Sequence, residues 1–188
     1  MFNKEELENL KLKLEKLEKK DIDLIISDFD DTIFCRNEQL EDSELLRNNR
    51  WEAWNEKILN EIWLEKYWNK YYKNKKIPKS IVSQLRKWHD VIITAWNEKL
   101  QNCKLTHTWL IHHNYIVVNN AEDKIIESIK YIINTLKFLP NKVTVYEDRP
   151  KYFIEYKDFI SDFLWIPVDI MYVEMKDNFN EPKITKIS

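Results

Sequence analysis

Five short apolar runs, each separated from the next by a segment with a helical pattern, constrain the fold of this chain most strongly. The runs are rich in valine and isoleucine and cover residues 24–27, 91–94, 115–118, 143–146 and 168–173. Short apolar runs of this kind are typical of buried strands. Amphipathic segments, of which residues 124–139 are the clearest, lie between them. This alternation predicts an α/β fold with a doubly wound, Rossmann-like parallel sheet.

Two segments lie outside this alternation. Residues 1–20 predict an N-terminal helix, because Asn3 can cap it and leucines recur every three or four positions. Residues 36–80 are rich in Glu, Asn, Lys, Tyr and Trp and show no strand pattern, which predicts a mostly helical insertion. We therefore expect a core made of residues 21–35 and 81–188, interrupted by this insertion.

Composition excludes several classes of protein. The net charge of the 188-residue chain is −2, so the chain lacks the overall basic character of many nucleic-acid-binding proteins. No stretch approaches the roughly 20 apolar residues that span a bilayer. The two cysteines, Cys35 and Cys103, do not form a disulfide framework. We expect a cytoplasmic protein with no membrane partner, and the sequence leaves the oligomeric state open.

The chain contains no glycine and eight tryptophans, although average composition predicts roughly 13 glycines. Trp88 and Trp165 fall at helix-to-strand junctions, Trp109 near a helix end and Trp96 in a loop after a strand. Glycine is the usual residue at helix ends, where φ is often positive. Our hypothesis is that UGA codons of this gene are read as glycine in its own cell. The alternative is a genuinely tryptophan-rich protein, with its tryptophans buried in a common core.

In doubly wound sheets, ligand sites form at the carboxyl ends of the strands. Asp28 and Asp30 follow the first strand, and Asp28 can attack phosphorus as a nucleophile. Asp30 can protonate the leaving oxygen and then deprotonate the water that cleaves the intermediate. Thr94 at the end of the second strand and Lys124 at a helix start can hold the phosphoryl oxygens.

Acidic residues also follow the fourth strand, in the order Glu147, Asp148 and Arg149. With Asp28, these carboxylates predict a site for Mg²⁺, which prefers hard oxygen ligands. Either Glu147 or Asp148 can be the main ligand. Arg149 can contact the substrate or pair with Glu147, and the sequence does not decide between the two.

Four strings resemble the motifs of the haloacid dehalogenase superfamily, in order and over residues 22–175. "LIISDFDDT" is similar to the first motif, "DVIITAW" to the second, "DKIIESI" to the third and "VTVYED" to the fourth. The resemblance implies a phosphohydrolase with Asp28 as nucleophile and Asp30 as acid and base. It also implies that Thr94 and Lys124 bind phosphate, and that Asp148, with Glu147 as second candidate, binds Mg²⁺.

The resemblance implies two further features. The backbone carbonyl of Asp30 would also bind the metal, and the insertion over residues 36–80 would cap the site. The string "YEDRP" is similar to one found in Swiss-army-knife RNA repair proteins of the same superfamily, although Tyr152 stands where a histidine often follows.

Three functions are therefore open at the level of sequence. The first is a Mg²⁺-dependent phosphohydrolase that cleaves a phosphate ester through an aspartyl-phosphate. The second is a nucleic-acid-end phosphatase or RNA repair module, in which lysines and tyrosines of residues 66–79 would face Asp28. The third is a non-catalytic binding or scaffold protein that uses its first helix.

Overall fold

The computed structural model of the chain describes residues 3–34, 76–95, 98–152, 154–174 and 181–187. The strands in this part of the chain are β1 (Asp23–Ser27), β2 (Val91–Ala95), β3 (Asn114–Val118), β4 (Lys142–Glu147), β5 (Val168–Glu174) and β6 (Lys183–Ile187). The α-helices are α1 (Lys4–Leu14), α4 (Lys79–Val82), α5 (Glu98–His107), α6 (Asp123–Lys130) and α7 (Ile160–Leu164). Short 3₁₀ or π-helical turns are η2 (Leu110–His112), η3 (Tyr131–Leu136), η4 (Pro150–Tyr152) and η5 (Glu155–Phe159).

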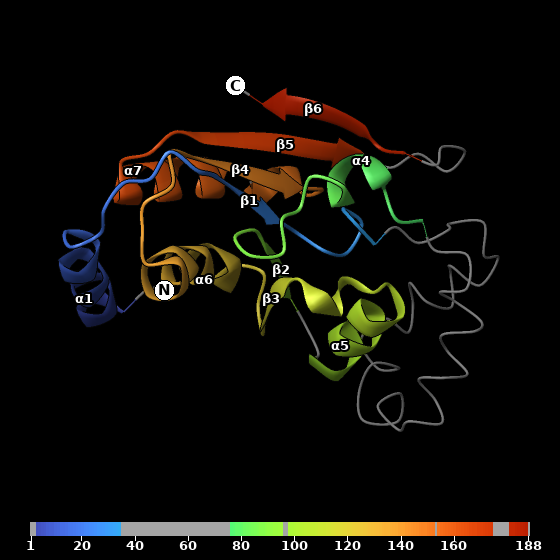
Figure 1. Ribbon diagram of the computed structural model, residues 1–188, viewed down its shortest axis with the longest axis horizontal. Coiled ribbons are helices and arrows are strands. Elements are labelled where there is room, and N and C mark those ends of the chain that lie inside the picture. Colours follow the sequence, from blue (N-terminus) through green and yellow to red (C-terminus); the bar gives the residue numbers. More distant parts are fainter. Residues whose placement is uncertain (1–2, 35–75, 96–97, 153, 175–180, 188) are drawn as a thin grey trace.

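The strands form one sheet in the order β3-β2-β1-β4-β5-β6, which confirms an α/β fold with a mostly parallel sheet. Each of the five predicted strands lies within one residue of its observed bounds. Strand β6 was not predicted, and it pairs antiparallel with β5 at the edge of the sheet. Its burial pattern lacks any fully buried residue, so the strand carries little of the apolar signal by which buried strands are recognised. Figure 1 shows β1, β4 and β5 pointing to the same side of the molecule and β6 pointing back.

Two groups of buried side chains pack against the sheet because successive strand residues point to opposite faces. Leu24 and Ile26 of β1 belong to the larger group, together with apolar residues of α6 and α7. Ile92 of β2 and Tyr146 of β4 belong to the second group, with Leu105 of α5. The strands are therefore covered by apolar contacts on both faces, as their almost continuous hydrophobic sequences require.

The N-terminal helix is shorter than predicted. It begins after Asn3, whose side chain accepts a hydrogen bond from the Glu5 N–H at 3.0 Å, but it ends at Leu14 instead of continuing to residue 20. Beyond it, Lys19 forms a parallel β-bridge with Leu139, and this pairing requires an extended backbone. Tertiary pairing thus overrides the helical pattern of the last six residues.

The other helical segments also differ in detail from their predicted bounds. The amphipathic segment 124–139 begins as α6 and continues as the π-helical turn η3, which ends before Lys137 at φ 58°. The segment 151–164 consists of η4, η5 and α7. The predicted helix over 80–87 is limited to α4 and a following turn. There, the Asp90 carboxylate accepts hydrogen bonds from the N–H groups of Arg86 and Ile25, both at 2.7 Å. The buried Asp90 therefore ends this helical segment and fixes the start of β2 to β1.

Three tryptophans lie within the described residues, and none belongs to the core. Trp88, Trp109 and Trp165 are 85%, 78% and 89% exposed. Trp109 and Trp165 also have left-handed backbones, with φ of 62° and 57°. Trp165 occupies the C-cap of α7, and Trp109 precedes η2. These tryptophans therefore do not form the common core that the alternative to recoding requires.

Among the described residues, no helix is both long and apolar enough to cross a lipid bilayer. The predicted insertion over residues 36–80 lies outside the described residues, except for its last five positions, where α4 begins at Lys79.

Candidate active site

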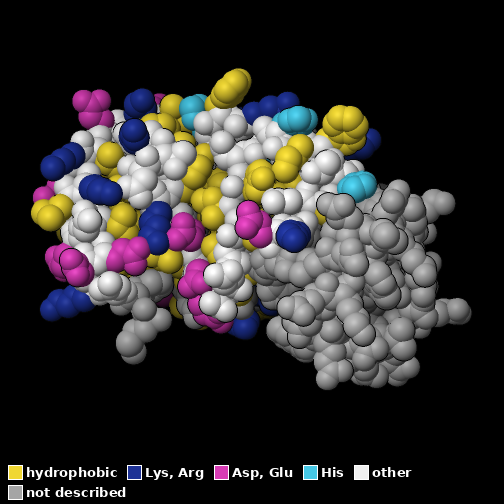
Figure 2. All heavy atoms as spheres, turned by 90° about the horizontal axis from the view of Figure 1, so that it is seen from below, with side chains coloured by type: hydrophobic (Ala, Val, Ile, Leu, Met, Phe, Trp, Pro, Cys, Tyr) yellow, Lys and Arg dark blue, Asp and Glu magenta, His cyan; other side chains and the backbone are white. Residues whose placement is uncertain are grey.

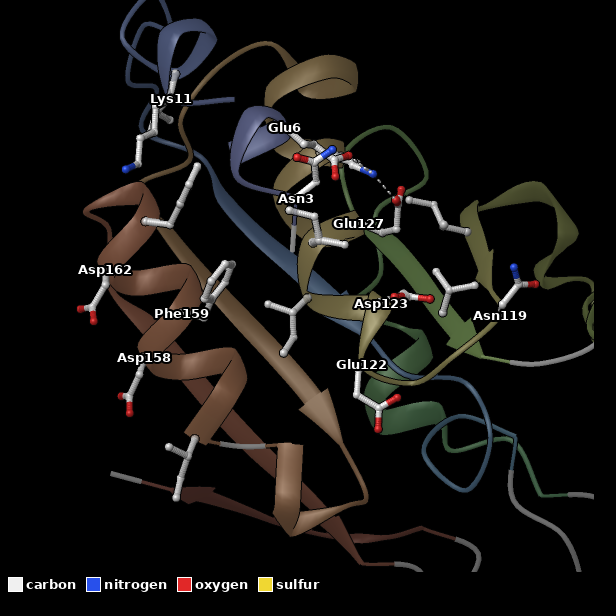
Figure 3. A pocket seen from close by; sticks show the side chains of 18 of the residues that line it. Asn3, Glu6, Lys11, Asn119, Glu122, Asp123, Glu127, Asp158, Phe159 and Asp162 are labelled. Carbon is white, nitrogen blue, oxygen red and sulfur yellow. Dashed lines mark hydrogen bonds and ion pairs between the residues drawn. The ribbon is translucent and has the colours of Figure 1, made fainter. Parts of the chain in front are cut away.

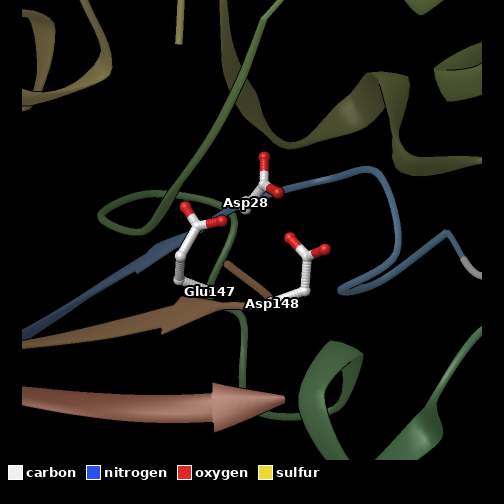
Figure 4. Close-up of side chains that lie close together, drawn as sticks. All are labelled: Asp28, Glu147 and Asp148. Carbon is white, nitrogen blue, oxygen red and sulfur yellow. The ribbon is translucent and has the colours of Figure 1, made fainter. Parts of the chain in front are cut away.

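Three carboxylates meet where β1 and β4 end. The two strands are parallel neighbours with Ser27 opposite Tyr146, and the Asp28 N–H continues this pairing by donating to the Tyr146 carbonyl at 2.9 Å. Asp28 therefore lies beside Glu147 and Asp148, as Figure 4 shows. One carboxylate oxygen from each of the three lies within 4.8 Å of the other two. Residues far apart in sequence thus form a single acidic cluster because their strands are adjacent.

Lys124 reaches this cluster from the start of α6. Its Nζ donates to Asp28 Oδ1 at 2.6 Å and lies 3.4 Å from Glu147 Oε2. The side chain is buried, and burial alone would lower the pKa of the ammonium. The carboxylates of Asp28 and Glu147 outweigh this effect, so the pKa of Lys124 is raised and the group carries a positive charge. Lys124 is consequently a fixed cation against the carboxylate predicted to attack phosphorus.

The other two carboxylates of the cluster, Glu147 and Asp148, lie close to Asp28 and to each other. Burial raises the pKa of Glu147 well above its usual value, and the neighbouring Asp28 adds to this, although Lys124 opposes it. Burial likewise raises the pKa of Asp148, and repulsion from Asp28 and Glu147 adds to the shift. One ammonium is therefore too little positive charge for two buried carboxylates and a third that is partly buried.

The donor set of this cluster fits a divalent cation. Its oxygens are hard ligands, and Mg²⁺ is commonly held by one or two carboxylates with waters and phosphate oxygens. Asp148 Oδ1 is buried and has no hydrogen-bond partner among the described residues. A buried carboxylate oxygen in that state costs free energy, which a bound cation would offset. Asp28, Glu147 and Asp148 are the described residues that could hold such an ion.

Asp30, two residues after Asp28, lies on a tight turn. The turn is closed by the Asp31 N–H, which donates to the Phe34 carbonyl at 3.0 Å, and Asp31 itself has φ 61°. The Asp30 carboxylate receives two hydrogen bonds from α5. Lys104 Nζ donates to Oδ1 at 2.7 Å, and Gln101 Nε2 donates to Oδ2 at 2.8 Å.

Lys104 and Gln101 were not predicted as site residues from the sequence. Their positions on α5 differ by three, which places both side chains on the same face of the helix. That spacing, in a helix directly after the second strand, is the signal that could have pointed to them. It could not have named Asp30 as their partner, because 71 or more residues separate them from it.

Thr94 lies near the end of β2, on the other side of β1 from β4. Ser27 pairs with Ile92, so Thr94 stands two residues beyond that pair, towards the end of the sheet where Asp28 lies. The Thr94 side chain is buried, and its hydroxyl has no hydrogen-bond partner among the described residues. A hydroxyl in that state retains its capacity to bind a ligand oxygen.

Arg149 is exposed, and its backbone contacts the cluster, since its N–H donates to Glu147 Oε1 at 3.4 Å. In a nucleic-acid-end phosphatase, the lysines and tyrosines of residues 66–79 are expected to face the site, and those up to residue 75 lie outside the described residues.

A hollow with a volume of about 1640 Å³ lies away from this cluster, between α1, α6 and the η5–α7 segment. Figure 3 shows acidic side chains from all three elements around it, and Figure 2, the view from below, shows charged and apolar side chains interspersed on the face that it presents. None of the predicted site residues lines it. Its charged lining consists of seven acidic residues and two lysines, namely Glu6, Glu15, Glu122, Asp123, Glu127, Asp158, Asp162, Lys11 and Lys130. An anionic ligand such as a phosphate would be repelled by this acidic lining.

Comparison of the chain with protein-family models, with curated proteins and with solved structures gives no significant match.

Proposed function

We propose that the chain is a Mg²⁺-dependent phosphohydrolase of the haloacid dehalogenase type that cleaves a phosphate ester through an aspartyl-phosphate on Asp28. The observation that carries the proposal is the buried Lys124 ammonium, 2.6 Å from Asp28 Oδ1, in a cluster with two further carboxylates. A nucleophilic carboxylate needs an ionised oxygen and a cationic surrounding for the phosphate it attacks. The Lys124 ammonium supplies such a cationic surrounding beside Asp28.

In the first step, an Asp28 carboxylate oxygen attacks phosphorus and the bond from phosphorus to the ester oxygen breaks. Asp30 gives its proton to the departing oxygen, so an alcohol leaves and the phosphoryl group stays on Asp28. In the second step, water attacks the same phosphorus and gives its proton to Asp30. The acyl-phosphate bond breaks, inorganic phosphate leaves, and Asp28 is again a free carboxylate.

Residues around the nucleophile would orient the phosphoryl group during both steps. Lys124 would bind a phosphoryl oxygen and offset its developing charge, and the Thr94 hydroxyl would donate to another. Asp28 and Asp148, with Glu147 as a further ligand, would hold Mg²⁺. The ion would supply positive charge to the phosphoryl oxygens when bound.

The family assignment rests on residue order and on the position of the residues in the fold. The four motif-like strings occur in the order of the superfamily, and their candidate residues lie at or just beyond the ends of adjacent strands or at the start of a helix. The strand order and the two groups of buried side chains support a doubly wound sheet. Residues 36–80 would form the cap that excludes water and selects the substrate.

The test is turnover of p-nitrophenyl phosphate and of a library of natural phosphate esters in Mg²⁺, with end-phosphorylated oligonucleotides included. Asp28→Asn should abolish turnover without changing the circular dichroism spectrum, because an amide cannot attack phosphorus. Asp158→Asn, at an exposed carboxylate in the hollow between α1, α6 and α7, is the matched control and should retain activity.

Activity of Asp28→Asn within tenfold of the parent would contradict the assignment of the nucleophile. A parent with no Mg²⁺-dependent turnover of any ester would favour a binding or scaffold protein instead.

A further inference from the structure

We propose that Lys104 and Gln101 of α5 are positioning residues that hold the Asp30 carboxylate in the place from which it transfers protons. This inference rests on the proposed function, since it assigns a role to two residues around the acid and base of that reaction. Neither residue belongs to the motif-like strings that led to Asp30.

The geometry is a two-point clamp on one carboxylate. Lys104 Nζ donates to Asp30 Oδ1 at 2.7 Å, and Gln101 Nε2 donates to Oδ2 at 2.8 Å. Gln101 Nε2 also donates to the Ala95 carbonyl at 3.0 Å, at the end of β2. The clamp therefore ties the turn after β1 to the end of β2 and to α5. Both carboxylate oxygens are engaged, which fixes the rotation of the side chain as well as its position.

The burial of the two donors is unusual for a helix whose only task is to cover a sheet. Gln101 is fully buried and Lys104 is 4% exposed, whereas lysine is almost never fully buried unless it is paired. An apolar residue at either position would satisfy packing without the cost of desolvating an amide or an ammonium. Lys104 also lies 5.4 Å from the centre of the Phe34 ring, at the far end of the same turn. The face of α5 that carries Gln101 and Lys104 thus makes polar contacts with the turn that carries Asp30.

The partner of this clamp is itself accessible. The Asp30 side chain is 26% exposed, against 5% for Lys104. Asp30 can therefore meet a substrate or a water molecule while its position is set from the buried side. Proton transfer in a bound complex depends steeply on the position of the acid and base. Loss of the clamp should slow the steps in which Asp30 moves a proton and leave phosphate binding unchanged.

The test uses the full-length protein with Lys104→Met and Gln101→Met, and with Lys99→Met as the matched control on an exposed part of α5. For each, kcat/KM is measured for esters whose leaving groups range from nitrophenolate to alkoxide. Lys104→Met should lower kcat/KM about 10–100-fold for alkyl esters and only slightly for the nitrophenyl ester, because a good leaving group needs no proton. Gln101→Met should show the same pattern with a smaller loss. The inhibition constant for inorganic phosphate should stay within about twofold of the parent.

A double variant separates positioning from direct contact. If Lys104 acts through Asp30, Lys104→Met should cause little further loss in an Asp30→Asn background. An additive loss, a weaker inhibition by phosphate, or an equal loss for all leaving groups would overturn the inference. If Lys104→Met fails to fold, Gln101→Met decides the matter by the same criteria. An active parent with unaffected clamp variants removes this inference alone, whereas an inactive parent removes the proposed function and this inference together.

Discussion

Trp109 and Trp165 stand where the backbone turns into the left-handed region, and their indoles are exposed. For an L-residue with a Cβ atom, this conformation costs roughly 1–2 kcal/mol, whereas glycine adopts it freely. An exposed indole also gains little from burial that could offset the strain. The position of Trp165 at the C-cap of α7 is one at which glycine commonly ends a helix. These observations support the hypothesis that Trp109 and Trp165 are glycines in the protein made by its own cell.

Trp165→Gly should therefore raise the free energy of unfolding by about 1 kcal/mol, measured by urea denaturation. Truncation of a buried tryptophan would instead cost about 3–5 kcal/mol. Trp165→Ala is the matched control, because it removes the indole and leaves the strain at positive φ. If alanine stabilises the protein as much as glycine, backbone strain is not the cause.

The genetic part of the hypothesis has a direct measurement. Peptide mass spectrometry of the protein from its native cell should give glycine at positions 88, 109 and 165. Tryptophan at these positions would refute recoding. Trp88 is exposed but is not among the positive-φ residues, so the strain argument applies to Trp109 and Trp165 and not to Trp88.

At the scale of elements, the pairing of β1 with β4 concentrates the charge of the site. The local sequence predicts both strands and the carboxylates after them, because dense apolar runs mark buried parallel strands. It cannot predict that the strands are neighbours, which depends on how the whole chain is wound. Hence the sequence could propose these candidate metal ligands from their places after the strands and from the motif order, but it could not give the distances between them.

The crowding at these strand ends predicts an unusual dependence of stability on pH. Folding raises the pKa of Glu147 to about 7 and that of Asp148 to about 9, from about 4 in an unfolded chain. The folded state thus holds protons that the unfolded state has released, so this contribution to stability is present below about pH 4 and is lost as pH rises through the raised values. In chelator, Asp148→Asn should gain melting temperature relative to the parent between about pH 5 and about pH 8.

Asp158→Asn serves as the control for this series, since it removes an exposed carboxylate elsewhere. The difference in melting temperature between the Asp158→Asn variant and the parent should not grow with pH. A difference between the Asp148→Asn variant and the parent that stays constant or shrinks as pH rises would show that the Asp148 carboxylate is not destabilised by its neighbours.

The contacts of Gln101 and Lys104 with Asp30 could not be predicted from the sequence, although the helix that carries them could. The helix after the second strand was predicted from residue 98 onwards, and α5 begins at Glu98. Yet nothing in the sequence distinguishes Gln101 and Lys104 from surface residues of a helix, because Asp30, which they contact, is distant in sequence. Strand β6 was missed for a different reason, since an exposed edge strand needs no apolar face. The missed features thus depend on tertiary contacts or on weak apolar patterning.

At the scale of the whole molecule, one end of the sheet gathers the Lys124 ammonium, the Thr94 hydroxyl and the three carboxylates of the Asp28 cluster. The acidic hollow between α1, α6 and α7 contains none of these groups.

A divalent ion at the Asp28 cluster should couple activity and stability. Chelation should abolish turnover, and added Mg²⁺ should restore it and raise the melting temperature, because the ion binds the folded state preferentially. Asp148→Asn should lose most of this thermal shift. Full activity in excess chelator would remove the metal from the mechanism.

The most direct measurement of the central claim is the capture of a phosphoryl group on Asp28. Labelled substrate is mixed with the Asp30→Asn variant, which should accumulate the intermediate because its hydrolysis needs the base. The reaction is quenched in acid, and the phosphorylated peptide is identified by mass spectrometry. Our account predicts a hydroxylamine-sensitive phosphate on Asp28 that is absent from Asp28→Asn. Substrate turnover by the parent with no phosphoprotein in either the parent or the Asp30→Asn variant, or with the phosphate on another residue, would contradict it.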